Sequence, residues 1–349
     1  YDNISRSLIT TGELRRMVEQ DGVLGVTSNP AIFEKAVAGS TDYDPAAKAL
    51  VSKGAREPKE IFEGLAIEDI QLATDILYPA YLETEGRDGY VSMEVSPYLA
   101  ADTEGTIEEA RRLHGSICRD NLMIKVPATP EGIPAIRQLV SEGININVTL
   151  LFAVDVYEQA ARAFMEGLES RLAAGGDIDR VASVASFFVS RIDTLVDQKL
   201  EEAGQSESLM GKVAVANAKL AYVVYKDLYA TEQWKVLAAK GARPQRLLWA
   251  STSTKNPKYS KTLYVDELIG LDTVNTVPTE TFHAFKEGGT VRATLTEDVE
   301  GAKETFRNIE ETGISMKAVT DQLLSEGVQK FSDAFDKLLT AIEQKGVNL

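Results

Sequence analysis

The chain has 349 residues, 44% of them hydrophobic, which is ample for a large core. Its 37 basic and 53 acidic side chains leave a formal net charge of −16, so the surface repels nucleic acid and anionic lipid. We therefore expect no nucleic-acid or membrane partner. The single cysteine, Cys118, excludes an internal disulfide and fits a reducing compartment, and no apolar run approaches the ~18 residues of a membrane span. These features predict a cytoplasmic protein.

Short apolar runs alternate along the chain with longer stretches of helical periodicity. The runs that predict strands are VLGVTS (23–28), YVSMEV (90–95), LMIKVP (122–127), INVTLLF (146–152), VASVASFFV (181–189), RLLWAS (246–251) and DTVNTV (272–277). Apolar stripes mark helices between and after them, most clearly over 157–168 and 328–342. Strand followed by helix, repeated, predicts a parallel sheet covered by helices.

Eight such units would close into a (β/α)8 TIM barrel, so the seven clear strands leave one to be found. The weaker run TVRATL (290–295) is one candidate. The other is a strand that ends at Tyr1-Asp2 and mostly precedes this sequence, and we favour it because a helical segment (12–21) follows at ordinary spacing. We predict a single barrel domain over 1–349 with additional helices and a truncated first strand. An open doubly wound sheet is the competing arrangement, but no G-x-G-x-x-G follows any strand.

Polar side chains recur near the ends of these strands, at positions that converge on one mouth in a barrel. They are Asp2, Asn29, Glu94, Lys125, Asn147, Thr149, Ser186 (with Phe188 on the same face), Thr252 and Lys255. Each has an ordinary structural explanation: Asn29, before Pro30, is expected to cap a helix, and a lone Lys125 in an apolar run is more often ion-paired than catalytic. Their coincidence at one mouth nevertheless predicts a reactive site.

Lys125 suggests the chemistry, because it lies within the apolar run LMIKVP. An ammonium group among apolar side chains loses hydration, and this favours the neutral amine. A neutral amine attacks a carbonyl to give a Schiff base, which breaks and forms carbon–carbon bonds without a metal or an organic cofactor. Glu94, Asp2 and Thr149 would supply the carboxylates and the ordered water that proton transfer needs.

Other chemistries are disfavoured by the sequence. Neither His114 nor His283 has a partner at metal-ligand spacing, so no metal is expected. His114 continues an apolar helical stripe and is expected to pack, and Cys118 is expected to be a small packed residue in a helix. No G-x-S-x-G and no Walker loop occurs.

An anion pocket is predicted after two of the later strands. Arg191 begins a helix just past one strand, and Ser251, Thr252 and Lys255 lie in the loop after another. Hydroxyls, cations and helix-start amides bind anions, and in barrels such pockets form at late strands. A surface ion pair of Arg191 with Asp193 or Glu158 explains this residue equally well on spacing alone. Together with Schiff-base chemistry, the pocket suggests a sugar phosphate.

Six motifs in order resemble the transaldolase family, in its longer bacterial branch. They are GVTSNPAIF (25–33), VSMEVSP (91–97), MIKVPAT (123–129), ININVTLLF (144–152), SFFVSRID (186–193) and LLWASTSTKNP (247–257). The resemblance implies a barrel that transfers a dihydroxyacetone unit in the non-oxidative pentose phosphate pathway. The implied donors are sedoheptulose 7-phosphate and fructose 6-phosphate, and the implied acceptors are glyceraldehyde 3-phosphate and erythrose 4-phosphate.

The same resemblance implies roles for the site residues. Lys125 matches the nucleophile, and Asp2 matches the residue that takes the proton from the donor's C4 hydroxyl. Glu94 and Thr149 match the pair that holds the catalytic water. The matching substrate-binding residues are Asn29 and Asn147 at the dihydroxyacetone part, and Ser186, Phe188 and Arg191 around the rest of the substrate and its phosphate. Lys255 stands in a loop where many members have arginine, and we carry the phosphate role to it, although a lysine lacks the bidentate fork.

Two alternatives remain open. A fructose-6-phosphate aldolase-like enzyme of similar architecture would release free dihydroxyacetone to water. A non-catalytic sugar-phosphate-binding barrel would need no amine beside a carboxylate, so Lys125, Glu94 and Thr149 weigh against it. Whether the protein is a monomer or a homodimer, which donor it prefers, and what the helical stretches at 198–240 and 315–346 cover do not follow from the sequence.

Overall fold

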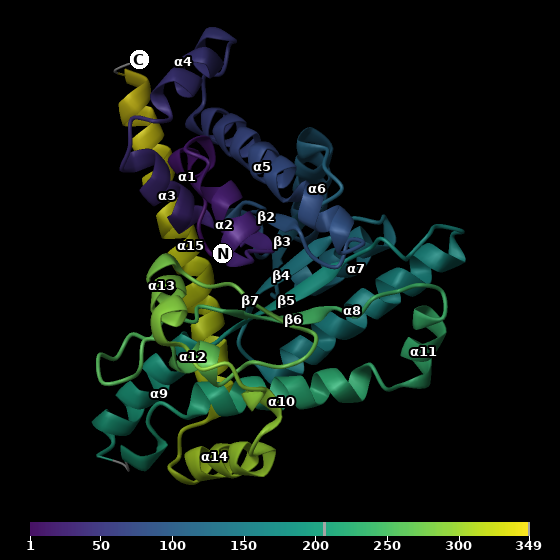
Figure 1. Cartoon of the computed structure of the whole chain (residues 1–349), viewed down its shortest axis with the longest axis vertical. Helices are drawn as coiled ribbons and strands as arrows, with labels where there is room; N and C mark the ends of the chain where they lie inside the picture. Colours follow the sequence, from purple (N-terminus) through teal and green to yellow (C-terminus); the bar gives the residue numbers. More distant parts are fainter. Residues whose placement is uncertain (205–206, 348–349) are drawn as a thin grey trace. The chain divides into compact units, whose positions relative to one another are not determined.

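The computed structural model describes residues 1–204 and 207–347, which form two compact units. The first unit comprises Tyr1–Lys125 and Val328–Leu349, and the second comprises Val126–Gly327. Figure 1 labels the helices and strands of both.

The first unit contains parallel strands and the helices that connect them. The strands are β1 (Gly25–Thr27), β2 (Tyr90–Glu94) and the first four residues of β3 (Leu122–Pro127). The helices are α1 (Arg6–Thr10), α2 (Glu13–Asp21), α3 (Pro30–Ala38), α4 (Asp44–Ser52), α5 (Pro58–Glu83), η1 (Pro97–Leu99), α6 (Thr103–Ile117) and the C-terminal part of α15 (Met316–Val347). β1 pairs with β2 and β2 with β3, all in parallel, and the register places Glu94 opposite Lys125.

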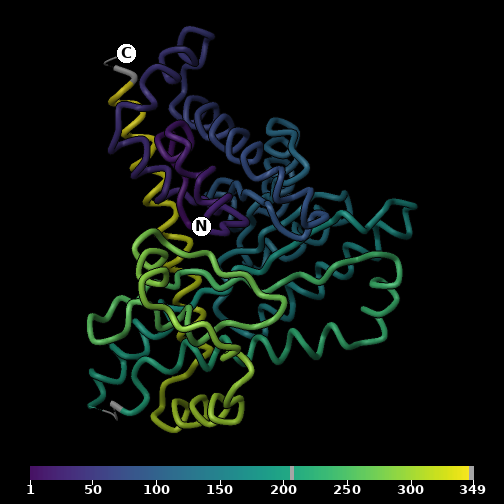
Figure 2. Tube along the Cα trace, viewed as in Figure 1, coloured from purple at the N-terminus to yellow at the C-terminus, as the bar shows by residue number. Residues whose placement is uncertain are grey.

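Residues from the end of the chain complete the first unit. The C-terminal part of α15 lies alongside α1 and α3 (Figures 1 and 2). The Lys345 ammonium lies 2.8 Å from the Asp44 carboxylate, and the Phe335 ring packs edge-on against Phe62 with 5.5 Å between centroids. These contacts anchor the helix, which also carries Phe331.

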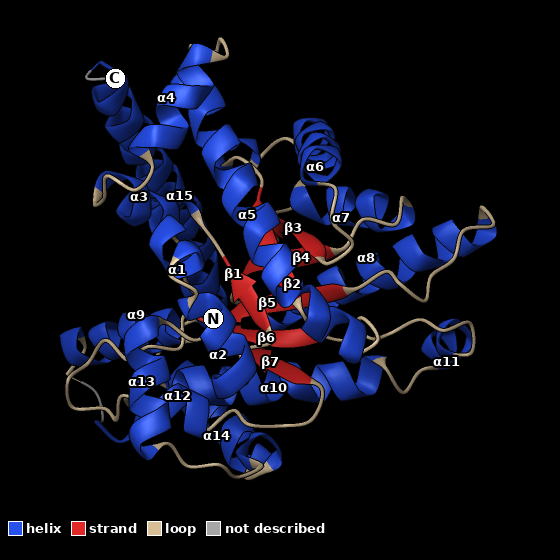
Figure 3. Ribbon diagram, turned by 45° about the horizontal axis from the view of Figure 1, so that its top comes forward, coloured by secondary structure: helices blue, strands red, loops and turns tan. Residues whose placement is uncertain are grey.

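The second unit contains four parallel strands that neighbour one another in chain order (Figure 3). The strands are β4 (Ile146–Leu151), β5 (Ser183–Phe188), β6 (Arg246–Ala250) and β7 (Thr273–Asn275). The helices are α7 (Gly132–Ser141), α8 (Val154–Ala173), α9 (Ser190–Glu202), η2 (Glu207–Leu209), α10 (Val213–Leu228), α11 (Glu232–Ala238), α12 (Leu263–Asp266), α13 (Thr279–Gly288), η3 (Thr294–Thr296) and α14 (Val299–Glu311). Every residue of β4 and β5 is buried, as expected for parallel strands with helices on one face and packed side chains on the other.

The predicted fold class is confirmed. All seven clear runs form strands, all are parallel, and helices follow them, which is the α/β architecture of a (β/α)8 barrel. The run 290–295 forms no strand, and its last two residues begin the 3-10 helix η3 (Thr294–Thr296). In the part of the chain that the structure describes, no helix combines the length and the apolar character needed to cross a bilayer.

Tyr1 lies beside β1 with the hydrogen bonds of a parallel ladder. Its backbone nitrogen donates to the Gly25 carbonyl over 2.7 Å, and the Thr27 N–H donates to the Tyr1 carbonyl over 2.9 Å. This pairing is what a strand ending at Tyr1 would make, and it places Asp2 at the carboxyl end of β1.

The expectation for Cys118 was wrong. This residue ends α6 in the left-handed conformation, with φ of 51°, and its side chain is exposed. The helix stops one residue earlier, so Cys118 turns away from the face on which Ile107 and Ile117 pack.

Candidate active site

Lys125 is buried at the end of β3, with 4% of its surface exposed. Its Nζ lies 3.5 Å from Glu94 Oε2 and donates to the Ser28 carbonyl over 3.2 Å. The Phe331 ring from α15 lies 5.8 Å from the same nitrogen. The amine therefore exchanges water for one carboxylate, one carbonyl and an aromatic face, as the apolar run around it predicts.

Glu94 is placed by the parallel register of β2 and β3. Burial raises the pKa of Glu94 to about 7, Lys125 acts in the opposite direction, and the charge of Asp2 adds to the rise. The proton of this carboxyl group is therefore near balance at neutral pH. A carboxyl group whose pKa is near neutral pH can both accept and donate a proton there, so Glu94 is suited to general acid–base chemistry beside Lys125.

Asp2 is fixed at the carboxyl end of β1. The Thr27 hydroxyl donates to Asp2 Oδ1 over 2.7 Å, and the carboxylate is half-buried. Thr27 is the last residue of β1, so Asp2 lies at the same end of the sheet as Glu94 on β2 and Lys125 on β3.

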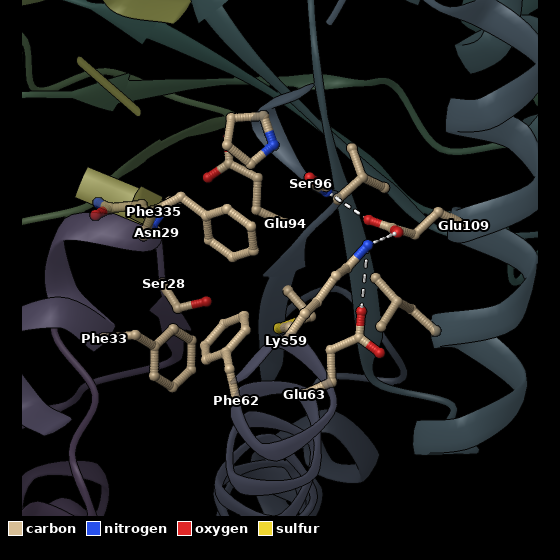
Figure 4. A pocket seen from close by; sticks show the side chains of 15 residues that line it. Ser28, Asn29, Phe33, Lys59, Phe62, Glu63, Glu94, Ser96, Glu109 and Phe335 are labelled. Carbon is tan, nitrogen blue, oxygen red and sulfur yellow. Dashed lines mark hydrogen bonds and ion pairs between the residues drawn. The ribbon is translucent and has the colours of Figure 1, made fainter. Parts of the chain in front are cut away.

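A small pocket opens beside Glu94 and Asn29 (Figure 4). Aromatic rings form one side of it, from Phe33, Phe62 and Phe335. Asn29 Oδ1 accepts from the Ile32 N–H over 3.0 Å and caps α3, as the sequence predicted. The rest of the Asn29 side chain lines the pocket.

Glu109 on α6 holds the turn that follows Glu94. Its carboxylate accepts the Ser96 N–H over 2.6 Å and pairs with the Lys59 ammonium over 2.9 Å, and both bonds are drawn in Figure 4. This fixes the chain two residues beyond Glu94. The hydroxyl of Ser96 is buried and has no hydrogen-bond partner in the described residues.

The second unit gathers Asn147, Thr149 and Ser186 on neighbouring strands. The Ser186 hydroxyl donates to Asn147 Oδ1 over 2.6 Å, and all three side chains are buried. The Thr149 hydroxyl is buried without a hydrogen-bond partner among the described residues. Buried polar groups are rarely left unpaired, so this hydroxyl suits a bound water or a substrate group.

The backbone beside Thr149 is strained. Leu150 has a φ of 57°, and the register of β4 against β5 shifts between Val148 and Leu151. The left-handed conformation costs a non-glycine residue about 1–2 kcal/mol. Bulges of this kind turn a side chain out of its regular direction, and they are frequent next to active sites.

Arg191 is the second residue of α9 and stacks on Phe188. Its guanidinium carbon lies 5.2 Å from the Phe188 ring centroid, and its Nη1 is buried without a partner in the described residues. Burial lowers the pKa of Arg191, which the charge of Glu326 opposes. The ion-pair explanation was wrong, because Asp193 accepts from a backbone amide and a tyrosine, and Glu158 pairs with Arg162.

The remaining predicted residues, Ser251, Thr252 and Lys255, lie in the loop after β6 and make different contacts. Ser251, with a φ of 55°, lies with its hydroxyl 3.0 Å from the Ser190 hydroxyl, and its carbonyl accepts the Ser190 N–H. Thr252 donates to Asn275 over 3.0 Å. Lys255 is exposed and donates to Ser253 over 2.6 Å. Ser251, rather than Lys255, is thus the residue bonded to the start of α9.

Three residues near Lys125 and Glu94 were missed by sequence reasoning. They are Ser28, Phe331 and Glu109. Phe331 was visible only as one apolar position in a helical stripe, and Ser28 contributes a backbone carbonyl that carries no sequence signal. Glu109 occupies an ordinary polar position of α6, and only the fold brings it to the end of β2.

A buried amine beside a carboxylate, at the carboxyl ends of neighbouring parallel strands, is suited to Schiff-base chemistry. The comparisons with known proteins agree with this class. The family described as Transaldolase/Fructose-6-phosphate aldolase matches residues 1–342. The chain belongs to this family.

Relatives resemble the chain over nearly its whole length. A protein named Transaldolase from Trichodesmium erythraeum (strain IMS101) is 50% identical over 99% of this chain and 93% of its own length. Transaldolase 2 from Nostoc punctiforme is 49% identical, with the same two coverages. A Transaldolase from Neisseria gonorrhoeae is 46% identical over 98% of this chain and 95% of its own length.

Proposed function

We propose that this protein is a cytoplasmic transaldolase of the non-oxidative pentose phosphate pathway. It transfers a dihydroxyacetone unit from sedoheptulose 7-phosphate or fructose 6-phosphate to glyceraldehyde 3-phosphate or erythrose 4-phosphate. The observation that carries the proposal is the Lys125 amine, 4% exposed and 3.5 Å from the Glu94 carboxylate. The names of the relatives support the choice of transaldolase within the family.

The first step joins the donor to the enzyme. Neutral Lys125 attacks the C2 carbonyl, and the resulting carbinolamine loses water to give a protonated Schiff base. Glu94 takes the proton from the attacking amine and returns it to the departing hydroxyl, in keeping with its pKa of about 7. The unpaired hydroxyl of Thr149 holds the water that is released.

The second step cleaves the donor. Asp2 takes the proton of the C4 hydroxyl, and the C3–C4 bond breaks so that the aldehyde leaves. The electrons of the C3–C4 bond form the C2–C3 double bond of an enamine, and the positive charge on the Schiff-base nitrogen is neutralised. The aldehyde acceptor then reacts with this enamine in the reverse sequence, and water releases the new ketose from Lys125. Phe331 covers the amine, which keeps water from the intermediate until the acceptor arrives.

The remaining polar residues bind the substrate. We assign Asn29 and Asn147 to the dihydroxyacetone hydroxyls. We assign Ser186, whose hydroxyl donates to Asn147, to the adjoining part of the substrate. We assign Arg191 and Ser251 to the phosphate, Phe188 to the pocket wall, and Lys255 to the approach of the anion. These roles belong to one reaction, and we therefore propose that 1–349 is one catalytic domain.

Borohydride reduction with fructose 6-phosphate tests the proposal. We expect a three-carbon adduct on Lys125, located by mass spectrometry, and loss of both adduct and transfer in Lys125→Met. Lys53→Met is the matched control, because Lys53 is an exposed lysine of the same unit that does not line the pocket. An adduct at another lysine, or transfer by Lys125→Met, would reject the mechanism. Free dihydroxyacetone released at the transfer rate would instead indicate the aldolase.

A further inference from the structure

Helix α9 buries two carboxylates one turn apart, just after Arg191. Asp193 is 1% exposed, and it accepts the Ala214 N–H over 2.7 Å and the Tyr264 hydroxyl over 2.8 Å. Asp197 is 7% exposed, and it accepts the Tyr259 hydroxyl over 2.6 Å and a backbone amide over 3.1 Å. Both oxygens of each carboxylate are therefore bonded.

The two tyrosines belong to the segment that leaves β6. This segment begins at Ser251, carries Lys255 in its middle, and passes Tyr259 before entering α12, which contains Tyr264. Figures 1 and 3 show α12 close to α9. The segment is thus bonded to α9 at its start, through Ser251 and Ser190, and again at its end, through the two tyrosines.

Packing alone does not account for this arrangement. Burying a carboxylate is costly even when it is hydrogen-bonded, and apolar side chains of similar volume would pack at least as well. Burial raises the pKa of Asp193 to about 7 and that of Asp197 above its usual value. Hydrogen bonds are directional and apolar contacts are not, so these bonds fix the position of the segment between Ser251 and α12.

Gly211 shows how closely the loop is held. Its φ is 70°, and a Cβ at this position would lie 2.7 Å from the Tyr259 ring. The residue that donates its N–H to Asp197 must therefore be a glycine, for reasons of both conformation and space.

We propose that Tyr259 and Tyr264, through Asp197 and Asp193, are positioning residues that hold the loop 251–262 against the start of α9. They thereby set the preference of the enzyme for phosphorylated over unphosphorylated substrates. The inference rests on the proposed function, because it takes Arg191 and Ser251 as the phosphate-binding pair. A displacement of about 1 Å between such groups is enough to weaken binding.

Removing single hydroxyls tests this role. Tyr259→Phe and Tyr264→Phe keep the rings and delete one hydrogen bond each. We expect KM for fructose 6-phosphate to rise roughly three- to tenfold, as for one lost hydrogen bond to a charged group. We expect kcat and KM for unphosphorylated fructose to stay within about twofold, since Lys125 is untouched. Competitive inhibition by inorganic phosphate should weaken by the same factor.

Tyr43→Phe is the matched control. The Tyr43 hydroxyl donates to buried Asp69 over 2.8 Å in the first unit, so this variant deletes the same kind of bond elsewhere. We expect it to lower the melting temperature without separating the two KM values. Equal rises in KM for both sugars, or no rise in either tyrosine variant, would overturn the inference. Failure of the proposed function is distinct, because wild-type protein would then form no borohydride adduct with either sugar.

Discussion

Glu94 and Lys125 lie opposite each other on parallel strands, with 3.5 Å between Oε2 and Nζ. Both side chains are buried, so the carboxylate lies beside the ammonium where little water reaches either group. Burial raises the pKa of Glu94 to about 7, which places its proton exchange near neutral pH. In the proposed mechanism, this carboxyl group takes the proton that Lys125 loses when it attacks the carbonyl.

Glu94→Gln should slow formation of the Schiff base by about 10²–10⁴-fold, because it removes proton transfer but keeps the shape of the side chain. Since the pKa of Glu94 is raised to about 7, the wild-type pH profile of kcat/KM should show a limb near pH 7. The variant should lose this limb. The time course of borohydride trapping and the pH profile check both points, with Glu109→Gln as a control outside the reacting pair. If the change of kcat/KM near pH 7 persists in Glu94→Gln, a group other than Glu94 is responsible for it.

Asp193 should make the stability of the protein fall as pH rises. Burial raises the pKa of this carboxyl from 3.8 to about 7, so between these values the folded protein holds a proton that the unfolded chain has lost. Its contribution to stability is complete below pH 4 and is lost as pH approaches 7. Asp193→Asn loses one hydrogen-bond acceptor at every pH, because its amide nitrogen cannot accept. The stability deficit of this variant against wild type should nevertheless shrink as pH rises from 5 to 8, since only the wild type loses stability over this range. Melting temperatures measure the difference, and Asp42→Asn, at an exposed carboxylate, should show no such trend.

The Lys125 and Glu94 pair could be predicted because both residues interrupt apolar runs near the ends of strands. Parallel pairing brings such positions to one edge of a sheet, whatever the details of the loops. The left-handed backbone at Leu150 could not be predicted, since leucine is not one of the residue types, such as glycine and asparagine, that favour this conformation. The strain is imposed by packing around β4, which leaves no local signal.

Whether Arg191 forms an ion pair with a nearby acid could also not be predicted without the fold. Asp193 lies two residues away, but its oxygens are taken by groups 21 and 71 residues along the chain, at Ala214 and Tyr264. The short spacing between Arg191 and Asp193 suggested an ion pair, but hydrogen bonds from distant residues occupy the Asp193 carboxylate instead. Lys255 was expected at the phosphate because of its place in the loop after β6. It is exposed there and donates to Ser253, and its phosphate role stays a prediction.

Arg6 should be a major contributor to stability in the first unit. Its guanidinium lies 2.6 Å from Asp69 and 2.8 Å from Glu68, and Asp69 is fully buried. Arg6→Met should lower the free energy of unfolding by about 3–5 kcal/mol, because it leaves a buried carboxylate without its cation. Denaturant unfolding measures this loss.

A second substitution separates the lost attraction from the lost packing. Arg6→Met combined with Asp69→Leu removes both charges, so the double variant should recover part of the stability. Lys235→Met is the surface control, since Lys235 pairs with Glu232 at a largely exposed site and its loss should cost less than about 1 kcal/mol. A double variant as unstable as the sum of both single variants would show that the charges do not interact as described.

Arg191→Met should affect phosphorylated substrates selectively. The buried Nη1 has no hydrogen-bond partner in the described residues, and a phosphate would supply one, so KM for fructose 6-phosphate should rise on the order of 10²-fold. KM for fructose should change little, because the Phe188 contact can be kept by a methionine. Lys255→Met, at an exposed cation, should raise KM for fructose 6-phosphate less than about threefold. Steady-state kinetics with both sugars distinguish the two cations, and a larger effect at Lys255 than at Arg191 would move the phosphate to the loop.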